Sequence, residues 1–423
     1  MQDMRKLSIA AVGVVAALAL AGCAGGTPAA EPETGDIRVW LVGTDTPDAA
    51  REYLKTTFEK ENPGSTLTIE EQAWPGLVDL LTTNLSGSDS PDVVEVGNTQ
   101  AAAFTSAGAF LDLTEDYEAL GGDDLLPGFV EAGSYDGKFY AAPLYSGARL
   151  VFYKKDALAA AGLEVPTTLD EYVSNAETLA SKNPGKSGIW WPGQDWYNAL
   201  PYIWENGGDI ATFKDGKWEA GFSSAGSIKG LEQVQEVMTK ASKAPKDANE
   251  TNPQVDYCEG KSLQISAPSW VKWSILAPED AEAPGCPAEE KNLGVYALPG
   301  ADGGAAQVFA GGSNIAVSAK SAHPTLAKKA LAIILSDEFQ TIYGKGGLVP
   351  AKLSLASTLG DDDVSKAITA AAGNARLTPA SPKWAEVEAS GLLTDFFVQI
   401  AQGGDVEDLA KDLDTKINDI LNG

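Results

Sequence analysis

Hydrophobic and polar positions follow two different rhythms near the start of the folded part of the chain. Residues 37–42 read Ile-Arg-Val-Trp-Leu-Val, a short run rich in β-branched and aromatic side chains that favours a strand. Within residues 47–61, Ala50, Leu54 and Phe58 recur at the spacing of one helix face, and an Asn-Pro-Gly sequence follows. The pattern therefore predicts a strand followed by a helix.

This alternation continues with a strand at residues 66–70, a helix at 75–85 and a third strand at 92–96. The leucines expected to face inward in the second helix are Leu77, Leu80, Leu81 and Leu85. Strands that alternate with helices predict a parallel sheet with right-handed crossovers. Loops at the carboxyl ends of such strands are the usual ligand site, which here means residues 43–45 and 97–100.

Further strand and helix signals lie in the second half of the chain. Residues 150–153 predict another strand, with a helix from Asp156. Thr168 precedes acidic residues and is typical of a helix start. His323 precedes Pro324 and a periodic apolar run, so we expect it at a helix N-terminus.

The first residues have a pattern of their own. Arg5 and Lys6 precede an apolar stretch, residues 7–20, that is too short to span a membrane and is typical of a secretory signal peptide over residues 1–22. The sequence Leu-Ala-Gly-Cys that ends at Cys23 resembles the lipobox of bacterial lipoproteins, which implies lipidation of Cys23. The alternative is an ordinary signal with an incidental cysteine. Residues 23–36 have the composition of a flexible tether.

Charge and residue counts exclude several classes of function. The formal net charge of −28 argues against nucleic acid or anionic lipid headgroups as partners. His323 is the one histidine in the sequence, and its expected place at a helix start argues against a Ser-His-Asp triad and a histidine-rich zinc site, so we expect no metal and no cofactor. Outside the cytoplasm, Cys258 and Cys286 predict a disulfide, and two free thiols are the alternative.

Aromatic residues gather in two places. Residues 189–204 contain Trp190, Trp191, Trp196, Tyr197, Tyr202 and Trp204, and a second group is Trp270 and Trp273. In a context rich in proline and glycine, we expect about half of them in the core and the others along a cleft. Aromatic faces suit the flat C–H-rich sides of a pyranose, while carboxylates and amides satisfy its hydroxyl groups.

Several collinear segments resemble the family 1 extracellular solute-binding proteins, which serve ABC sugar importers. The longest is residues 143–156, Pro-Leu-Tyr-Ser-Gly-Ala-Arg-Leu-Val-Phe-Tyr-Lys-Lys-Asp. The other matching segments are residues 90–98, 161–163, 165–171, 205–209, 311–317, 321–324 and 347–350. The resemblance covers essentially all of the chain after the signal.

The resemblance implies an α/β, two-lobe periplasmic-binding-protein fold, type II-like, in which each lobe is a mixed or parallel sheet flanked by helices. The expected N-terminal lobe is residues 37–145 with 305–350, and the C-terminal lobe is 146–304 with 351–423. The chain would cross between lobes near Tyr145, Ala305 and Pro350. The lobes of this family close over a ligand by hinge motion.

The resemblance also implies a set of ligand-binding residues. The predicted set is Thr44, Asp45, Asn98, Thr99, Gln100, Tyr145, Asp195, Trp196, Tyr197, Asn198, Trp270, Gly311, Gly312 and Trp384. Thr44 and Asp45 would meet hydroxyl groups, Trp196 and Trp270 would stack on sugar rings, and glycines would let the backbone approach the ligand. Gly147 stands where maltose-binding members can carry an acid, which argues against maltose.

The sequence thus predicts a non-enzymatic receptor that captures a sugar, with an oligosaccharide such as chitobiose or a cello-oligosaccharide favoured, and delivers it to ABC permease subunits. We expect a monomer outside the cytoplasm that meets the membrane through its lipid anchor and binds no nucleic acid. A lipid-anchored glycoside hydrolase is the main alternative, because the same aromatic and acidic residues would suit one. A peptide- or polyamine-binding relative is a third possibility.

Overall fold

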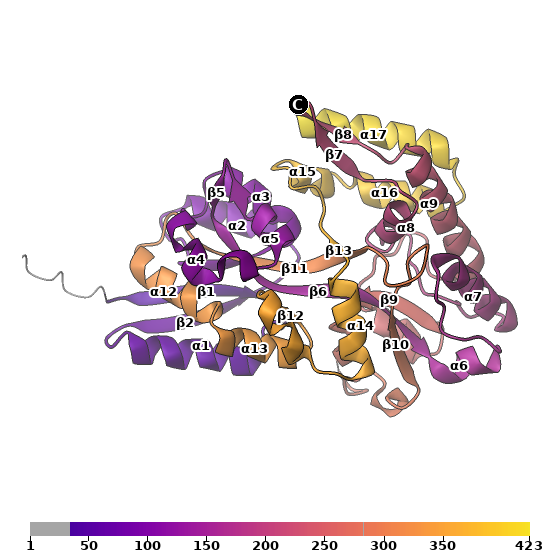
Figure 1. Ribbon diagram of the computed structural model, residues 1–423, viewed down its shortest axis with the longest axis horizontal. Coiled ribbons are helices and arrows are strands. Elements are labelled where there is room, and N and C mark those ends of the chain that lie inside the picture. The colour runs from indigo at the N-terminus through magenta and orange to yellow at the C-terminus, as the bar shows by residue number, and fades with distance from the viewer. Residues whose placement is uncertain (1–33, 282) are drawn as a thin grey trace, which may run out of the picture. The chain divides into compact units, whose positions relative to one another are not determined.

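Helices and strands alternate along most of the chain (Figure 1), in a computed structural model that describes residues 34–281 and 283–423. The strands are β1 Asp36–Val42, β2 Thr66–Gln72, β3 Val93–Gly97, β4 Ser134–Tyr135, β5 Lys138–Phe139, β6 Ala141–Lys154, β7 Ala211–Lys214, β8 Lys217–Ala220, β9 Gln264–Pro268, β10 Leu293–Ala297, β11 Val308–Val317, β12 Val349–Pro350 and β13 Ala375–Arg376.

The helices are α1 Asp48–Glu61, α2 Leu77–Ser86, α3 Asn98–Ser106, α4 Tyr117–Leu120, α5 Pro127–Ala132, α6 Lys155–Ala160, α7 Leu169–Lys182, α8 Leu200–Glu205, α9 Ala225–Glu236, α10 Pro253–Cys258, α11 Val271–Ile275, α12 Pro324–Ile334, α13 Asp337–Lys345, α14 Asp363–Ala372, α15 Trp384–Ala389, α16 Leu392–Ala401 and α17 Val406–Asn422.

The parallel arrangement predicted for the first three strands is confirmed. β1 pairs in parallel with both β2 and β3. Because side chains alternate across a strand, Val39 packs with α1, α12 and α13, while Trp40 and Val42 pack with α2 and α3 on the opposite face. One prediction for α2 is wrong. Leu80 is 37% exposed, whereas the other three leucines of that helix are buried.

β6 is much longer than the strand predicted at residues 150–153. Its first half pairs with β11, and its second half lies between β9 and β10. Nearly all of β6 is buried on both sides, so its first residues, which include Pro143 and Gly147, show no alternation of polar and apolar positions. A pattern search for half-buried strands therefore misses the start of β6.

β6 and β11 run side by side through the middle of the view in Figure 1. Along β6, Leu144 and Tyr145 pack in one hydrophobic cluster and Ala148 in another. Along β11 the same change falls between Phe309 and Ile315. The two clusters therefore meet at these paired strands, and the exact lobe boundaries given above stay a prediction.

Several local predictions are confirmed. The Thr168 hydroxyl caps α7 by accepting the Glu171 N–H at 3.2 Å, and His323 precedes the first residue of α12. Cys258 and Cys286 form a disulfide with a Cα–Cα distance of 5.4 Å.

The predicted signal peptide, the lipidation at Cys23 and residues 23–33 of the predicted tether lie outside the described residues. Across residues 34–281 and 283–423, each helix is too short or too polar to span a bilayer.

Candidate functional site

A cavity of about 430 Å³ opens where the two large hydrophobic clusters meet. Its volume lies within the usual range for small-molecule pockets. Its walls are formed by Asp45, Trp74, Gly97, Asn98, Thr99, Gln100, Tyr145, Arg149, Tyr197, Glu250, Pro268, Trp270, Phe309, Gly311 and Gly312.

The loop after β1 places Asp45 in the wall. Asp45 Oδ2 accepts hydrogen bonds from Trp74 Nε1 and from the Tyr145 hydroxyl, each at 3.1 Å. Burial raises the pKa of Asp45, although both donors act in the opposite direction. Its second carboxylate oxygen remains available as an acceptor for a ligand hydroxyl.

The start of α3 supplies the next part of the wall. The Asn98 side-chain amide donates to the Ala310 carbonyl at 2.9 Å, which ties this helix to β11. The Thr99 hydroxyl donates to Glu388 Oε2 at 2.9 Å, and Gln100 Nε2 lies 3.4 Å from the same oxygen. Glu388 belongs to α15, so these bonds join two helices that belong to different hydrophobic clusters. Burial raises the pKa of Glu388 to about 7.

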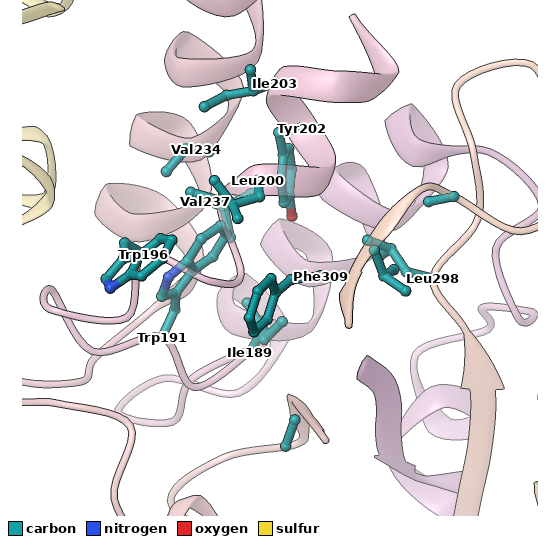
Figure 2. Packing of buried hydrophobic residues seen from close by; sticks show 14 of the residues in the cluster. Ile189, Trp191, Trp196, Leu200, Tyr202, Ile203, Val234, Val237, Leu298 and Phe309 are labelled. Atoms are coloured by element: carbon teal, nitrogen blue, oxygen red, sulfur yellow. The ribbon is translucent and has the colours of Figure 1, made fainter. Parts of the chain in front are cut away.

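Three aromatic rings form another side of the cavity: two of them face the cavity, and the third packs behind them. Tyr197 stacks on Phe309 with ring centroids 4.7 Å apart, and Trp196 lies behind Tyr197 at 3.9 Å. Trp196 is only 5% exposed, and Figure 2 shows it among the core residues beside Trp191. Tyr197 and Phe309 therefore face the cavity, whereas Trp196 supports Tyr197 from the core.

Arg149 is a buried cation in the cavity wall. Its guanidinium forms an ion pair with Glu250, lies 3.9 Å from Asp195 and stands 5.3 Å from the centre of the Tyr197 ring. Arg149 Nη1 also donates to Asn198 Oδ1 at 3.2 Å. Burial raises the pKa of Asp195, which accepts hydrogen bonds from the backbone and side chain of Asn198.

Nine of the fourteen predicted site residues line this cavity. They are Asp45, Asn98, Thr99, Gln100, Tyr145, Tyr197, Trp270, Gly311 and Gly312. The other five lie away from its wall. Thr44 is exposed. Asp195 and Asn198 contact Arg149 on the side away from the cavity, and Trp196 packs behind Tyr197. Trp384 is fully buried and donates a hydrogen bond to Glu388 at 3.0 Å.

Sequence reasoning missed several residues of the wall. Trp74 follows β2, at the same sheet edge as the loops that were considered, so the strand-end rule would have found it had it been applied to all three strands. Arg149 and Phe309 lie within β6 and β11. No loop signal marks them, because their place in the cavity wall follows from how two long strands pass the cavity. Glu250 is identified only by its ion pair with Arg149.

The lining combines aromatic faces with carboxylate and amide groups, and it offers no metal site. In the part of the chain that the structure describes, no group of three or more His, Cys, Asp or Glu side chains is placed to hold a metal ion. Such a wall is chemically suited to a ring-shaped molecule with apolar faces and polar edges.

Comparison with known proteins gives the family. The model for bacterial extracellular solute-binding proteins matches residues 43–341. The diacetylchitobiose binding protein DasA of Streptomyces coelicolor is 31% identical over 429 residues, which cover 98% of each chain.

Solved structures share the fold. The GacH receptor of Streptomyces glaucescens aligns with a TM-score of 0.79 at 22% identity, over 92% of this chain and 99% of that one. The sugar-binding protein MalE of Xanthomonas citri aligns with a TM-score of 0.78 at 21% identity, over 92% of this chain and 97% of that one. The predicted periplasmic-binding-protein fold is thereby confirmed. The chain belongs to the bacterial extracellular solute-binding protein family.

Proposed function

We propose that the solute is a sugar, and specifically an oligosaccharide. It binds in the cavity between the side that carries Asp45, here the Asp45 wall, and the side formed by Tyr197 and Phe309, here the Tyr197 wall. The observation that carries this proposal is the meeting of aromatic faces and hydrogen-bonding groups around one 430 Å³ cavity. Trp270 and Tyr197 offer ring faces, while Asp45 and Gln100 offer polar atoms. The 31% identity to a diacetylchitobiose binding protein supports the same substrate class.

The physical basis is the two-sided chemistry of a pyranose. Its faces carry C–H groups that gain free energy when an aromatic ring displaces water. Its hydroxyl groups must keep hydrogen-bond partners, because each buried group left without one costs about 1 to 3 kcal/mol. Asp45 retains acceptor capacity after its bonds to Trp74 and Tyr145, so it is suited to a sugar hydroxyl.

The charges of the wall favour an uncharged sugar over an acidic one. Asp45 and Glu250 are the carboxylates of the lining, and Arg149 is the cation among the lining residues. The Arg149 guanidinium is already ion-paired with Glu250. A uronic acid would bring its carboxylate near these acids without a free cation to pair with, which is unfavourable in a desolvated site.

The transport role extends this proposal beyond the cavity. We propose that the two lobes close over the sugar and that ABC permease subunits recognise the closed form. The change of hydrophobic cluster along β6 and β11 supports hinge positions in those strands. Lipidation at Cys23 would hold a monomeric receptor on the outer face of the cell membrane, close to its permease.

We further propose that the protein does not hydrolyse its sugar. Asp45 and Glu250 are the two acids of the wall, and Glu250 is held in an ion pair with Arg149. A glycoside hydrolase needs two carboxyl groups free to act on the glycosidic bond, one as the acid and the other as the base or nucleophile. The membership in a binding-protein family supports the same conclusion.

A thermal-shift panel tests the proposal. A ligand that binds only the native state raises the melting temperature in proportion to RT ln(1 + [L]/Kd). We expect shifts with diacetylchitobiose or cello-oligosaccharides and none with the matching uronic acid oligomers. Shifts with peptides or polyamines alone would refute the sugar assignment, and release of reducing ends beyond the amount of protein would refute the receptor assignment.

A further inference from the structure

Two glycines face each other on neighbouring strands beside the cavity. The register of β6 and β11 pairs Gly147 directly with Gly311; Gly311 lines the cavity, and Gly147 lies against Trp270, which also lines it. Neither has a positive φ, so the backbone at these positions is open to any residue. The absence of side chains here therefore serves space rather than chain conformation.

The space above this pair is filled by Trp270. A β-carbon placed on Gly147 would lie 2.6 Å from Trp270 Cε3 and closer still to Cζ3. On Gly311 it would lie 3.2 Å from Trp270 Cη2. The nearest atoms to the Gly147 β-carbon all belong to this indole, so an alanine there would displace a side chain and no backbone.

The backbone that carries Trp270 is fixed to the same strand. The Ser269 N–H donates to the Ala148 carbonyl at 2.9 Å, and Pro268 of β9 pairs with Arg149 of β6. The turn is held next to Gly147, and the indole lies against the glycine pair. Trp270 also packs against both large hydrophobic clusters, which places it where they meet.

We propose that Gly147 and Gly311 are positioning residues that seat Trp270 and thereby set the depth of the surface on which the sugar stacks. This inference rests on the proposed function. Stacking weakens steeply with separation, since dispersion contacts are lost when atoms move apart or overlap by a fraction of an ångström. Raising the indole by one methyl group would narrow the cavity and exclude a sugar ring that now fits.

Neighbouring Gly312 differs in kind. Its φ of 133° belongs to the region that favours glycine, and the nearest atom to an added β-carbon is the Tyr145 carbonyl oxygen. Gly312→Ala is therefore expected to disturb the strand itself, whereas Gly147→Ala acts on Trp270. This contrast separates a backbone role from the proposed seat.

A double-mutant cycle tests the seat with sugar titrations by calorimetry. We expect Gly147→Ala to weaken sugar binding by about tenfold or more, and Gly311→Ala by a smaller factor, since its contact is looser. In a Trp270→Ala background, adding Gly147→Ala should change affinity by less than about twofold, because its target is gone. Gly87→Ala is the matched control, since its nearest neighbours would be at 3.5 Å and the site lies outside the cavity wall.

A second readout needs no sugar. In the protein that keeps Trp270, Gly147→Ala should change the near-ultraviolet circular dichroism spectrum of the ligand-free form. In the Trp270→Ala variant, the same substitution should leave that spectrum unchanged. If no sugar binds the unsubstituted protein, the proposed function fails while this arm still tests the seat. An equal loss of affinity in both backgrounds, or an unchanged spectrum with Trp270 present, would overturn the inference. Should Gly147→Ala fail to fold, Gly311→Ala provides the same two comparisons.

Discussion

Glu95 gives the protein a pH-dependent stability that can be worked out from its surroundings. This carboxylate lies in β3 with no exposed surface, and its Oε2 accepts the Val42 N–H at 2.8 Å. Burial raises its pKa from 4.5 to about 7, and the nearby charge of Asp45 adds to the effect. The native state therefore holds a proton at Glu95 that the unfolded state releases at lower pH.

The sign and size follow from this difference. Between the two pKa values the native state binds more protons than the unfolded state, so the free energy of unfolding falls as pH rises. The stabilisation is complete below the unfolded pKa and is lost as pH passes through about 7. A difference of about 2.5 pKa units corresponds to about 3 kcal/mol, at about 1.36 kcal/mol per unit.

Glu95→Gln isolates this contribution, because glutamine keeps an acceptor for Val42 and carries no charge at any pH. Urea unfolding followed by tryptophan fluorescence, from about pH 4.5 to about pH 8, gives the free energies of both proteins. We expect the two to be equally stable at the acidic end and the variant to be more stable by up to about 3 kcal/mol at the basic end.

Glu52→Gln, on the exposed side of α1, is the matched control. Glu388 also titrates near pH 7 but is present in both proteins, so the comparison cancels it. A stability difference that stays constant across the pH range would refute the assignment of the titration to Glu95.

Three further predictions follow from the site and the covalent features. Tyr197→Ala should weaken sugar affinity by about 1 to 3 kcal/mol in calorimetry. Trp196→Ala should instead lower the free energy of unfolding by about 3 to 5 kcal/mol, because Trp196 lies in the core. A loss of stability with Tyr197→Ala and a loss of affinity alone with Trp196→Ala would refute the assignment of these rings. Replacing Cys258 and Cys286 by serine should lower the free energy of unfolding by about 3.5 kcal/mol, and an unchanged urea midpoint would contradict it. Cys23→Ser should release the protein into the medium with sugar affinity unchanged, as immunoblots of cell and medium fractions would detect.

The predictability of the fold from sequence depended on how each element is buried. α1 was predicted because it buries one stripe, which leaves a periodic pattern. β1 is buried on both faces and was predicted from its β-branched and aromatic side chains instead. The first half of β6 is also buried on both faces, and its residues 141–148 have neither alternation nor β-branched side chains, so it was missed. Leu80 was placed inward by composition, although its position on α2 leaves it 37% exposed.

The site was predictable where a local signal exists. Asp45 and Asn98 follow strand ends, so a rule about parallel sheets found them. Arg149 and Phe309 were not found, because their place in the wall depends on the register between β6 and β11, which a single sequence does not encode locally. Trp196 was taken as a stacking surface, and only the packing distances separate it from Tyr197 in front of it.

The strands that join the two hydrophobic clusters also carry the cavity wall, so the proposed closure of the lobes would act on the wall itself. β6 contributes Tyr145 and Arg149, and β11 contributes Phe309, so a bend in these strands must change the spacing between the walls. A ligand shifts a conformational equilibrium only by its difference in affinity for the two states. A sugar that touches the Asp45 wall alone has no such difference, whereas one that spans to Tyr197 does. The bond from Thr99 to Glu388 joins the same two sides without any ligand, so it favours the same arrangement that a spanning sugar would select.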